Sequence, residues 1–223
     1  MQGQRAELDW RDGGVPVSVR FDDPYFSLDD GLAETRYVFL DGNGLPDRFR
    51  PGFHVAELGF GTGLNFLATW AAWDEAGLEG AFHFTSFEAF PMTRDQMARA
   101  HAAFPELASL SQQLIELWRP EGGLFDLGKA QLTVVARDAR EALTDWDGQA
   151  DAWYLDGFSP AKNPELWEKA LMADVARHTA PGGTIATYTA AGFVRRALEA
   201  AGFTVTRRAG FGRKRHMTVG VLA

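Results

Sequence analysis

Short apolar runs alternate with helical patterns along most of this chain. The runs have the length and the Val, Ile, Phe, Thr and Tyr content of buried strands. We expect strands at residues 54–58, 81–88, 131–137, 151–156 and 184–189. Apolar residues at three- and four-residue spacing predict helices at 64–76, 93–103, 106–118, 139–145, 165–178 and 191–201. This alternation predicts an α/β fold whose sheet is mostly parallel and covered on both faces.

The two ends of the chain depart from this alternation. FTVTRRAGFGRKRHMTVGVL (203–222) has the pattern of two strands joined by a short basic turn, which predicts an antiparallel edge to the sheet. Residues 1–50 precede the first core strand and carry a hairpin pattern around 15–21 and a helical pattern around 30–40. We therefore expect an N-terminal extension, residues 1–50, packed on a core domain of residues 51–223 in a single folded unit.

Composition excludes several classes of protein. The chain is 46% hydrophobic and 23% charged, which is typical of a globular domain with one ample core. It contains no cysteine, so disulfides and thiolate metal sites are excluded; this suits a reducing cytosol, and it also suits many exported bacterial proteins. The histidines, at positions 54, 83, 101, 178 and 216, lack ligand-like spacing, so no metal site is expected. Neither a signal peptide nor a membrane span is recognisable, and we expect a cytoplasmic protein.

The charge is distributed unevenly. Residues 195–215 carry seven basic residues and one acid, a local charge of +6 in a chain whose net charge is −8. One interpretation is a solvated helix face followed by a charged hairpin. The other is a basic patch that binds phosphate on an otherwise acidic body, with Arg213, Lys214 and Arg215 of the turn as substrate contacts.

The first core strand ends in ELGFGTGLNF, which places three glycines directly before a helix. Glycines at this turn let the backbone approach a ligand, and the following helix directs free N–H groups at negative charge. The spacing is not the G-x-G-x-x-G of dinucleotide-binding proteins. E-x-G-x-G-x-G resembles the first motif of S-adenosylmethionine-dependent methyltransferases, although a tight structural turn is the alternative. We expect cofactor contacts from Glu57, Gly59, Gly61, Gly63 and Asn65.

Acidic residues end four successive strands of the predicted sheet: Glu57, Glu88, Asp138 and Asp156. In an open α/β sheet, ligands bind beyond the carboxyl ends of the strands, where the strand order reverses. Glu88 lies at the position where an acid accepts the ribose hydroxyls of an adenosyl group, and Asp138 is placed to accept from the adenine amine. Each acid alone is equally well explained as solvated. Together they favour a nucleoside-type cofactor, and S-adenosylmethionine ahead of NAD.

Asp156 begins the loop in DAWYLDGFSPAKNPELW. A short carboxylate there can simply cap the next segment. In methyltransferases that act on amino groups, however, a loop after the fourth strand with Asp or Asn and a proline positions the nitrogen, and DGFSP is a loose relative of that pattern. A carboxylate can orient an amine and take its proton. We therefore expect a functional role for Asp156.

Four segments together resemble the tRNA 5-methylaminomethyl-2-thiouridine methyltransferase family: ELGFGTGLNF, LDGFSPAKNPELW, DDPYFSLDDGLAETRYVFL and GFGRKRHM. The resemblance implies the Rossmann-like fold of S-adenosylmethionine-dependent methyltransferases, and it implies that Asp156 is the catalytic residue. It also implies methylation of the aminomethyl nitrogen of 5-aminomethyl-2-thiouridine at the wobble position, in the anticodon stem-loop of tRNA. The family occurs alone or fused to a flavin-dependent oxidase. Because no second domain is recognisable here, we expect methylation alone, with a separate or fused oxidase as partner.

Aromatic residues near the predicted site are candidates for binding the base. Tyr25, Phe26, Phe158 and Trp167 can form walls for a splayed-out uridine, because enzymes that act on a base take it out of the stack. Trp167 fits equally well as an anchor of its helix on the sheet. Two other functions stay open: a methyltransferase for a small-molecule or protein amine, and a non-catalytic nucleotide-binding module in which Asp156 is only a cap.

Overall fold

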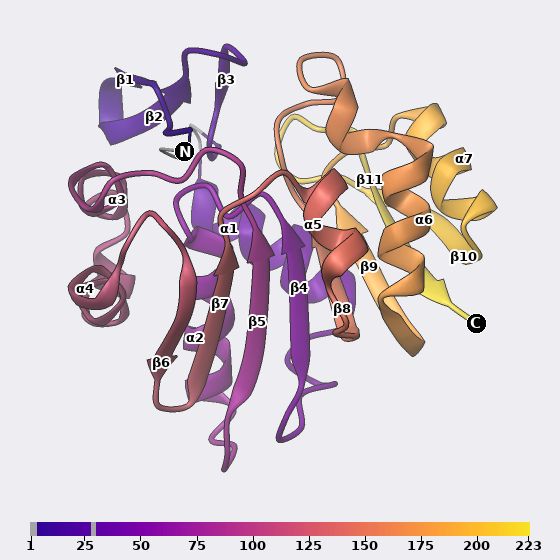
Figure 1. Cartoon of the computed structure of the whole chain (residues 1–223), viewed down its shortest axis with the longest axis horizontal. Coiled ribbons are helices and arrows are strands. Elements are labelled where there is room, and N and C mark those ends of the chain that lie inside the picture. The colour runs from indigo at the N-terminus through magenta and orange to yellow at the C-terminus, as the bar shows by residue number, and fades with distance from the viewer. Residues whose placement is uncertain (1–3, 28–29) are drawn as a thin grey trace.

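The computed structural model describes residues 4–27 and 30–223, and in these ranges it has one large sheet of eight strands (Figure 1). Across the sheet the strands are β10 (Phe203–Ala209), β11 (His216–Leu222), β9 (Thr179–Thr187), β8 (Ala150–Leu155), β4 (His54–Leu58), β5 (Phe82–Phe87), β7 (Ala130–Val135) and β6 (Gly123–Leu127). The five strands from β9 to β7 are parallel, and β10–β11 forms the predicted antiparallel edge. The predicted α/β fold is confirmed.

Two features of the sheet differ from the prediction. β6 pairs antiparallel with β7 at the other edge, where no strand was expected. Only Phe125 of β6 is buried, because the strand has a neighbour on one side only, so the period-two signal is too weak to read from sequence. β9 begins at Thr179, ahead of the predicted start at 184, and runs through the Pro181–Gly183 segment beside an irregularity in its pairing with β8.

Helices cover both faces of the sheet, because strands buried on both sides alternate their apolar side chains between two cores. On β8, Tyr154 belongs to one hydrophobic cluster, and Trp153 and Leu155 belong to the other. Figure 1 shows α5, α6 and α7 on the near face and α2 on the far face. The helices are α2 (Leu64–Glu75), α3 (Arg94–His101) and α4 (Ala108–Leu117) with the first cluster, and α5 (Ala139–Asp145), α6 (Lys169–Arg177) and α7 (Gly192–Ala200) with the second.

The N-terminal extension has two parts, apart from residues 1–3 and 28–29, which lie outside the described residues. The first part is a small antiparallel sheet of β1 (Leu8–Arg11), β2 (Val15–Ser18) and β3 (Asp23–Pro24), which Figure 1 shows above the carboxyl ends of β4 and β5. The second part is α1 (Gly31–Thr35) with the helical segment that follows it, whose side chains enter the same core as α2. The extension therefore completes the core and also covers the strand ends.

The strand order reverses at β4. The chain passes from β4 to β5 and β7 on one side, and it then returns to β8 on the other side of β4. The loops that follow β4 and β8 therefore begin side by side and lead to opposite sides of the sheet. Open α/β sheets bind ligands at such a position. The two loops also touch: a Cβ on Gly59 would lie 2.9 Å from the carbonyl oxygen of Asp156.

Candidate active site

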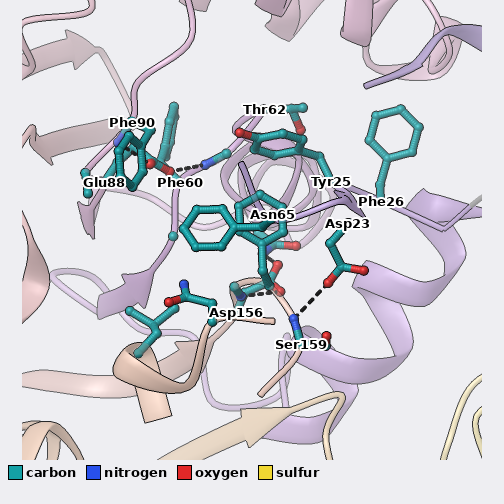
Figure 2. Close-up of a pocket in the computed structure, with 18 of the residues that line it drawn as sticks. Asp23, Tyr25, Phe26, Phe60, Thr62, Asn65, Glu88, Phe90, Asp156 and Ser159 are labelled. Atoms are coloured by element: carbon teal, nitrogen blue, oxygen red, sulfur yellow. Dashed lines mark hydrogen bonds between the residues drawn. The ribbon is translucent and has the colours of Figure 1, made fainter. Parts of the chain in front are cut away.

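A cavity of about 870 Å³ lies at this reversal point, beneath the small N-terminal sheet (Figure 2). Its volume is in the range of pockets that hold small-molecule ligands. Most of the residues predicted for the site line the cavity: Tyr25, Phe26, Gly59, Gly61, Asn65, Glu88, Asp138, Asp156, Phe158, Arg213 and Lys214. Three predicted residues, Glu57, Gly63 and Arg215, do not line it.

All three glycines of the loop between β4 and α2 adopt left-handed backbone conformations, with φ of +88° at Gly59, +54° at Gly61 and +77° at Gly63. A Cβ at Gly61 would lie 3.0 Å from the Tyr25 ring, and a Cβ at Gly63 would lie 2.8 Å from the Phe60 ring. Gly63 therefore serves the turn itself, whereas Gly61 lets the loop line the cavity beneath Tyr25. The N–H groups of the three glycines already donate within the protein, to the carbonyl oxygens of Phe87 and Phe60 and to Glu88. What the loop offers a nucleoside-type cofactor is therefore close approach of a backbone without side chains.

Glu88 fixes the position of this loop. Its two carboxylate oxygens accept hydrogen bonds from the backbone N–H groups of Gly61, at 2.8 Å, and Phe90, at 2.7 Å. Burial raises the pKa of the carboxyl group. The backbone of Phe60 is a third hydrogen-bond partner of the carboxylate. A carboxylate has about four acceptor positions, so Glu88 can still bind a ribose hydroxyl while it holds the loop. The sequence analysis anticipated the ribose contact but not this role in the loop.

Asp138 is at the rim of the cavity and caps α5. Its carboxylate accepts from the backbone N–H of Arg140 at 2.9 Å and pairs with the Arg140 guanidinium at 2.6 Å. The hydrogen bond from this guanidinium lowers the pKa of Asp138. The capping role considered for Asp156 is thus found at Asp138, and its contact with adenine stays a prediction.

The carboxylate of Asp156 is held at both oxygens. Oδ2 accepts from the Asn65 side-chain amide at 2.8 Å, and Oδ1 accepts from the backbone N–H of Gly157 at 2.8 Å. Burial raises the pKa of Asp156 to about 6, although the hydrogen bonds from Asn65 and Gly157 and the charge of Lys214 act in the opposite direction. The group is therefore an oriented carboxylate whose proton affinity is higher than that of an ordinary Asp.

Asn65 connects Asp156 to the protein interior. Its Oδ1 accepts from the Thr35 hydroxyl at 3.0 Å, so its Nδ2 faces both Asp156 and Glu57, the latter at 2.8 Å. Glu57 is fully buried beneath the cavity and also accepts from Ser86 at 2.6 Å. Burial raises the pKa of Glu57 to about 8, against the effect of its two hydrogen bonds. Asn65 and Glu57 were both predicted as cofactor contacts. Asn65 lines the cavity and holds Asp156, whereas Glu57 holds only Asn65.

Aromatic residues form one wall of the cavity, and Tyr25 of this wall lies beside the glycine loop. Phe158, two residues after Asp156, stacks on Phe21 with ring centroids 4.7 Å apart, and the Tyr25 ring meets it edge-on at 5.0 Å. Phe21 was not among the predicted residues. The loop that carries Phe158 is fastened to the N-terminal sheet, because the backbone N–H of Ser159 donates to Asp23 at 2.8 Å (Figure 2).

Two other aromatic residues have mainly structural contacts. Phe26 packs edge-on against Phe104, with centroids 4.9 Å apart, although it also lines the cavity. Trp167 is buried in the second hydrophobic cluster, and its indole N–H donates to the Phe158 carbonyl at 3.0 Å. Of the two roles considered for Trp167, the structure supports the anchor.

His101 at the end of α3 is a further residue that sequence reasoning missed. It is buried, and its Nε2 lies 2.6 Å from the carbonyl oxygen of Thr62 in the glycine loop. Nε2 must donate there, because a carbonyl only accepts, so Nδ1 accepts from the Ser111 hydroxyl 2.7 Å away. His101 lies 39 residues after Thr62 and belongs to no local motif, so nothing short in the sequence indicates this contact.

Lys214 of the basic turn points into the site. Its Nζ lies 2.6 Å from Oε1 of Glu34 and 4.3 Å from the centroid of the Tyr188 ring. Arg213 lines the same cavity, whereas Arg215 does not. Two of the three cations of this turn therefore line the cavity, and Lys214 is the one that pairs with Glu34 there.

The described residues contain no helix of the length and apolarity that a bilayer crossing requires. Within residues 4–27 and 30–223, no group of three or more His, Cys, Asp or Glu side chains is arranged to hold a metal ion.

Comparisons with known proteins agree with this geometry. The chain is 52% identical, over 96% of its length, to the tRNA 5-methylaminomethyl-2-thiouridine biosynthesis bifunctional protein MnmC of Aeromonas hydrophila. It spans about a third (35%) of that relative. The crystal structure of MnmC2 from Aquifex aeolicus superposes with a TM-score of 0.80 at 24% identity, over 99% of this chain and 72% of that one.

A crystal structure of a methyltransferase from Pyrococcus furiosus shares the fold more distantly, with a TM-score of 0.51 at 16% identity over 87% of this chain and 84% of that one. A family model described as S-adenosyl-L-methionine-dependent methyltransferase matches residues 105–223, which is more than half of the chain. With a glycine loop, an acid after β5 and an oriented carboxylate after β8 around one cavity, this chain belongs to the S-adenosyl-L-methionine-dependent methyltransferases.

Proposed function

We propose that this chain methylates the aminomethyl nitrogen of 5-aminomethyl-2-thiouridine at the wobble position of tRNA, giving 5-methylaminomethyl-2-thiouridine. The observation that carries the proposal is Asp156, a carboxylate held by Asn65 and Gly157 in the same cavity as the glycine loop. The similarity to MnmC supports tRNA as the substrate. The cytoplasm as location and a flavin-dependent oxidase as partner belong to the same proposal. A partner with a second activity fits the relative, which is a bifunctional protein.

The chemistry requires that an amine become nucleophilic beside an electrophile. S-adenosylmethionine, when bound, supplies a methyl group on a positively charged sulfur. The residues that fit this cofactor are the glycine loop and Glu88, with Asp138 at the rim. Asp156 accepts one hydrogen bond at each oxygen and so has acceptor capacity left for the substrate's ammonium group. Asp156 takes one proton from the ammonium, which frees the nitrogen lone pair to accept the methyl group that the bound cofactor would supply.

Positioning contributes a large part of the rate, because two reactants are held in one cavity at fixed orientation. The bonds from Asn65 and Gly157 restrict the Asp156 carboxylate to one orientation. The wall of Phe158, Phe21 and Tyr25 offers aromatic faces and edges to a base that has left the anticodon stack. Phe158 of this wall lies two residues after Asp156 on one loop, so base binding against Phe158 places the aminomethyl group near Asp156.

The direct test is mass spectrometry of wobble nucleosides. tRNA that bears 5-aminomethyl-2-thiouridine is incubated with the protein and S-adenosylmethionine, and the wobble nucleoside is expected to gain one methyl group. Methylation of free amines or protein amines, with the tRNA unchanged, would favour the other class of amine methyltransferase. Cofactor binding without any turnover would favour the non-catalytic module.

The pH dependence of the reaction follows from the environment of Asp156. Because burial raises the pKa of Asp156 to about 6, the carboxyl group is protonated below that pH and cannot take the substrate proton. We expect kcat/KM to rise as the pH increases through about 6 and then to level. The measurement is kcat/KM for methyl transfer across the acidic and neutral range. A profile that stays flat down to the ordinary pKa of Asp, about 4, would contradict this role.

The basic turn is predicted to bind tRNA phosphate through Arg213 and Arg215. Each lost phosphate contact reduces counterion release, so Arg213→Gln with Arg215→Gln should weaken tRNA binding and lower the salt slope of log affinity by roughly 1 per contact. The measurement is tRNA affinity over a series of salt concentrations. The control is Arg119→Gln with Lys129→Gln, which removes the same charge near β6 and β7, at the opposite edge of the sheet. If both double variants had the same salt slope of tRNA affinity, the turn would not bind phosphate and would be only a solvated surface.

A further inference from the structure

Lys214, Glu34 and Tyr188 form a cation site inside the catalytic cavity. The Lys214 ammonium lies 2.6 Å from the Glu34 carboxylate and 4.3 Å from the centroid of the Tyr188 ring. All three residues line the cavity that contains Asp156. A carboxylate together with an aromatic face is a general recognition site for ammonium groups.

The side of the site that receives the cation is rigid. Glu34 is a residue of α1 with 8% of its surface exposed, and it is followed by Thr35, which hydrogen-bonds Asn65. The Tyr188 hydroxyl donates to the carbonyl of Gly157 at 2.7 Å, directly after Asp156. The backbone beside Glu34 is therefore tied through Thr35 to the amide that holds Asp156, and the Tyr188 ring is tied to the loop that carries Asp156.

The cation itself is held less firmly. Lys214 is on the turn between β10 and β11, and 45% of its side chain is exposed even in this position. A lysine side chain leaves such a site by rotating its own torsions towards solvent, with no change in the core. The Lys214–Glu34 pair differs from what the basic turn was predicted to do. The Lys214 ammonium is directed at a buried acid of this chain and not at solvent, where phosphate would be bound.

We propose that Glu34 and the face of Tyr188 are the binding site for the primary ammonium group of the substrate, and that Lys214 occupies it until the substrate enters. The inference rests on the proposed function, in which the acceptor is an aminomethyl group. A lysine side chain ends in –CH2–NH3⁺, and the acceptor carries the same terminal group. A site shaped for one therefore fits the other.

Replacement of Lys214 by the substrate ammonium group also affects the charge around Asp156. The Lys214 charge acts to lower the pKa of Asp156, and the Glu34 charge acts to raise it, so the three groups interact. A substrate ammonium in the place of Lys214 supplies the same positive charge, which keeps the carboxylate ionised until it takes the proton. The displaced Lys214 then turns towards solvent, on the exposed side of the turn between β10 and β11.

The first experiment measures the site without methyl transfer, using methylammonium as the probe and saturation-transfer NMR on its methyl signal. Lys214→Met keeps the length and apolar contact of the side chain but vacates the site, so methylammonium should bind this variant at least tenfold more tightly than the wild type. Lys214→Met combined with Glu34→Gln should lose that binding. Arg207→Met removes one charge from the neighbouring strand β10 and should behave like the wild type.

The second experiment measures KM and kcat with tRNA that bears the aminomethyl group. Glu34→Gln should raise KM at least tenfold with a smaller effect on kcat, and Lys214→Met should lower KM because the internal competitor is gone. The proposal is overturned if methylammonium binds no variant, or if Lys214→Met raises KM while Glu34→Gln leaves it unchanged. The latter result would make Lys214 a phosphate contact. Because the NMR arm needs no turnover, an inactive wild type would count against the proposed function alone.

Discussion

Replacement of Asp156 by Asn is expected to reduce methyl transfer ~10²-fold or more, the usual scale for a lost acid or base, while donor and tRNA still bind. Asn keeps the shape of Asp and one acceptor oxygen, but it cannot take a proton from the substrate ammonium. One of the two donors now directed at Asp156, from Asn65 or Gly157, loses its acceptor, so a moderate decrease in melting temperature accompanies the loss. The measurement is methyl incorporation into aminomethyl-bearing tRNA at saturating donor.

The matched control for this variant is Asp151→Asn. Asp151 lies near the start of the same strand, β8, at the opposite end of the sheet, where it pairs with Arg50 and accepts from the backbone of His54. Asp151→Asn is the same chemical change at a residue that does not line the cavity, so this variant should methylate at the wild-type rate. If Asp156→Asn retained more than about half the rate on a folded protein, far above the level left by a lost base, Asp156 would be only a structural residue.

Replacement of Gly61 by Val is expected to abolish measurable S-adenosylmethionine binding. Gly61 has a φ of +54°, which a β-branched residue strongly disfavours, and its Cβ would lie 3.0 Å from the Tyr25 ring. The loop or Tyr25 must then move, and the hydrogen bond from Gly61 to Glu88 is lost with it. A distorted cofactor loop is thus expected to lose its affinity for S-adenosylmethionine. Isothermal titration calorimetry measures this affinity.

A second glycine separates backbone strain from the effect on the site. Gly77 follows α2 with a φ of +65°, and a Cβ there would meet no atom within 4 Å. Gly77→Val therefore carries similar conformational strain away from the cavity, and it should lower the melting temperature while cofactor affinity stays at the wild-type level. Wild-type cofactor affinity in Gly61→Val as well would remove the loop from the binding site.

The architecture was largely predictable because its signals are local. Apolar runs of strand length and helical spacing between them reflect burial on two faces, and each can be read within about ten residues. α5 was placed at its observed bounds, and β4, α2 and α7 were placed within one residue at each end. The exceptions are segments whose burial is one-sided or interrupted. β6 buries one side chain, and the beginning of β9 contains proline and two glycines.

The chemistry of the site was predictable to the extent that it follows from position in the fold. Acids at successive strand ends must meet at one edge of a parallel sheet, so the strand pattern alone was enough to assign Glu88 and Asp156 to the cavity that they line. The same argument included Glu57, but a residue one position before the strand end points into the interior, and Glu57 is fully buried there. Its side chain reaches the site only through Asn65.

What the sequence determined alone is therefore the alternation of the core strands and helices along the chain, the edge of the sheet at which ligands bind, and the residue types presented there. What only the tertiary structure decided is which side chains meet across long separations. Asn65 reaches Asp156 over 91 residues, and Lys214 reaches Glu34 over 180. Such contacts leave no periodic trace, because hydrogen bonds and ion pairs depend on distances of about 3 Å that only the packed core sets.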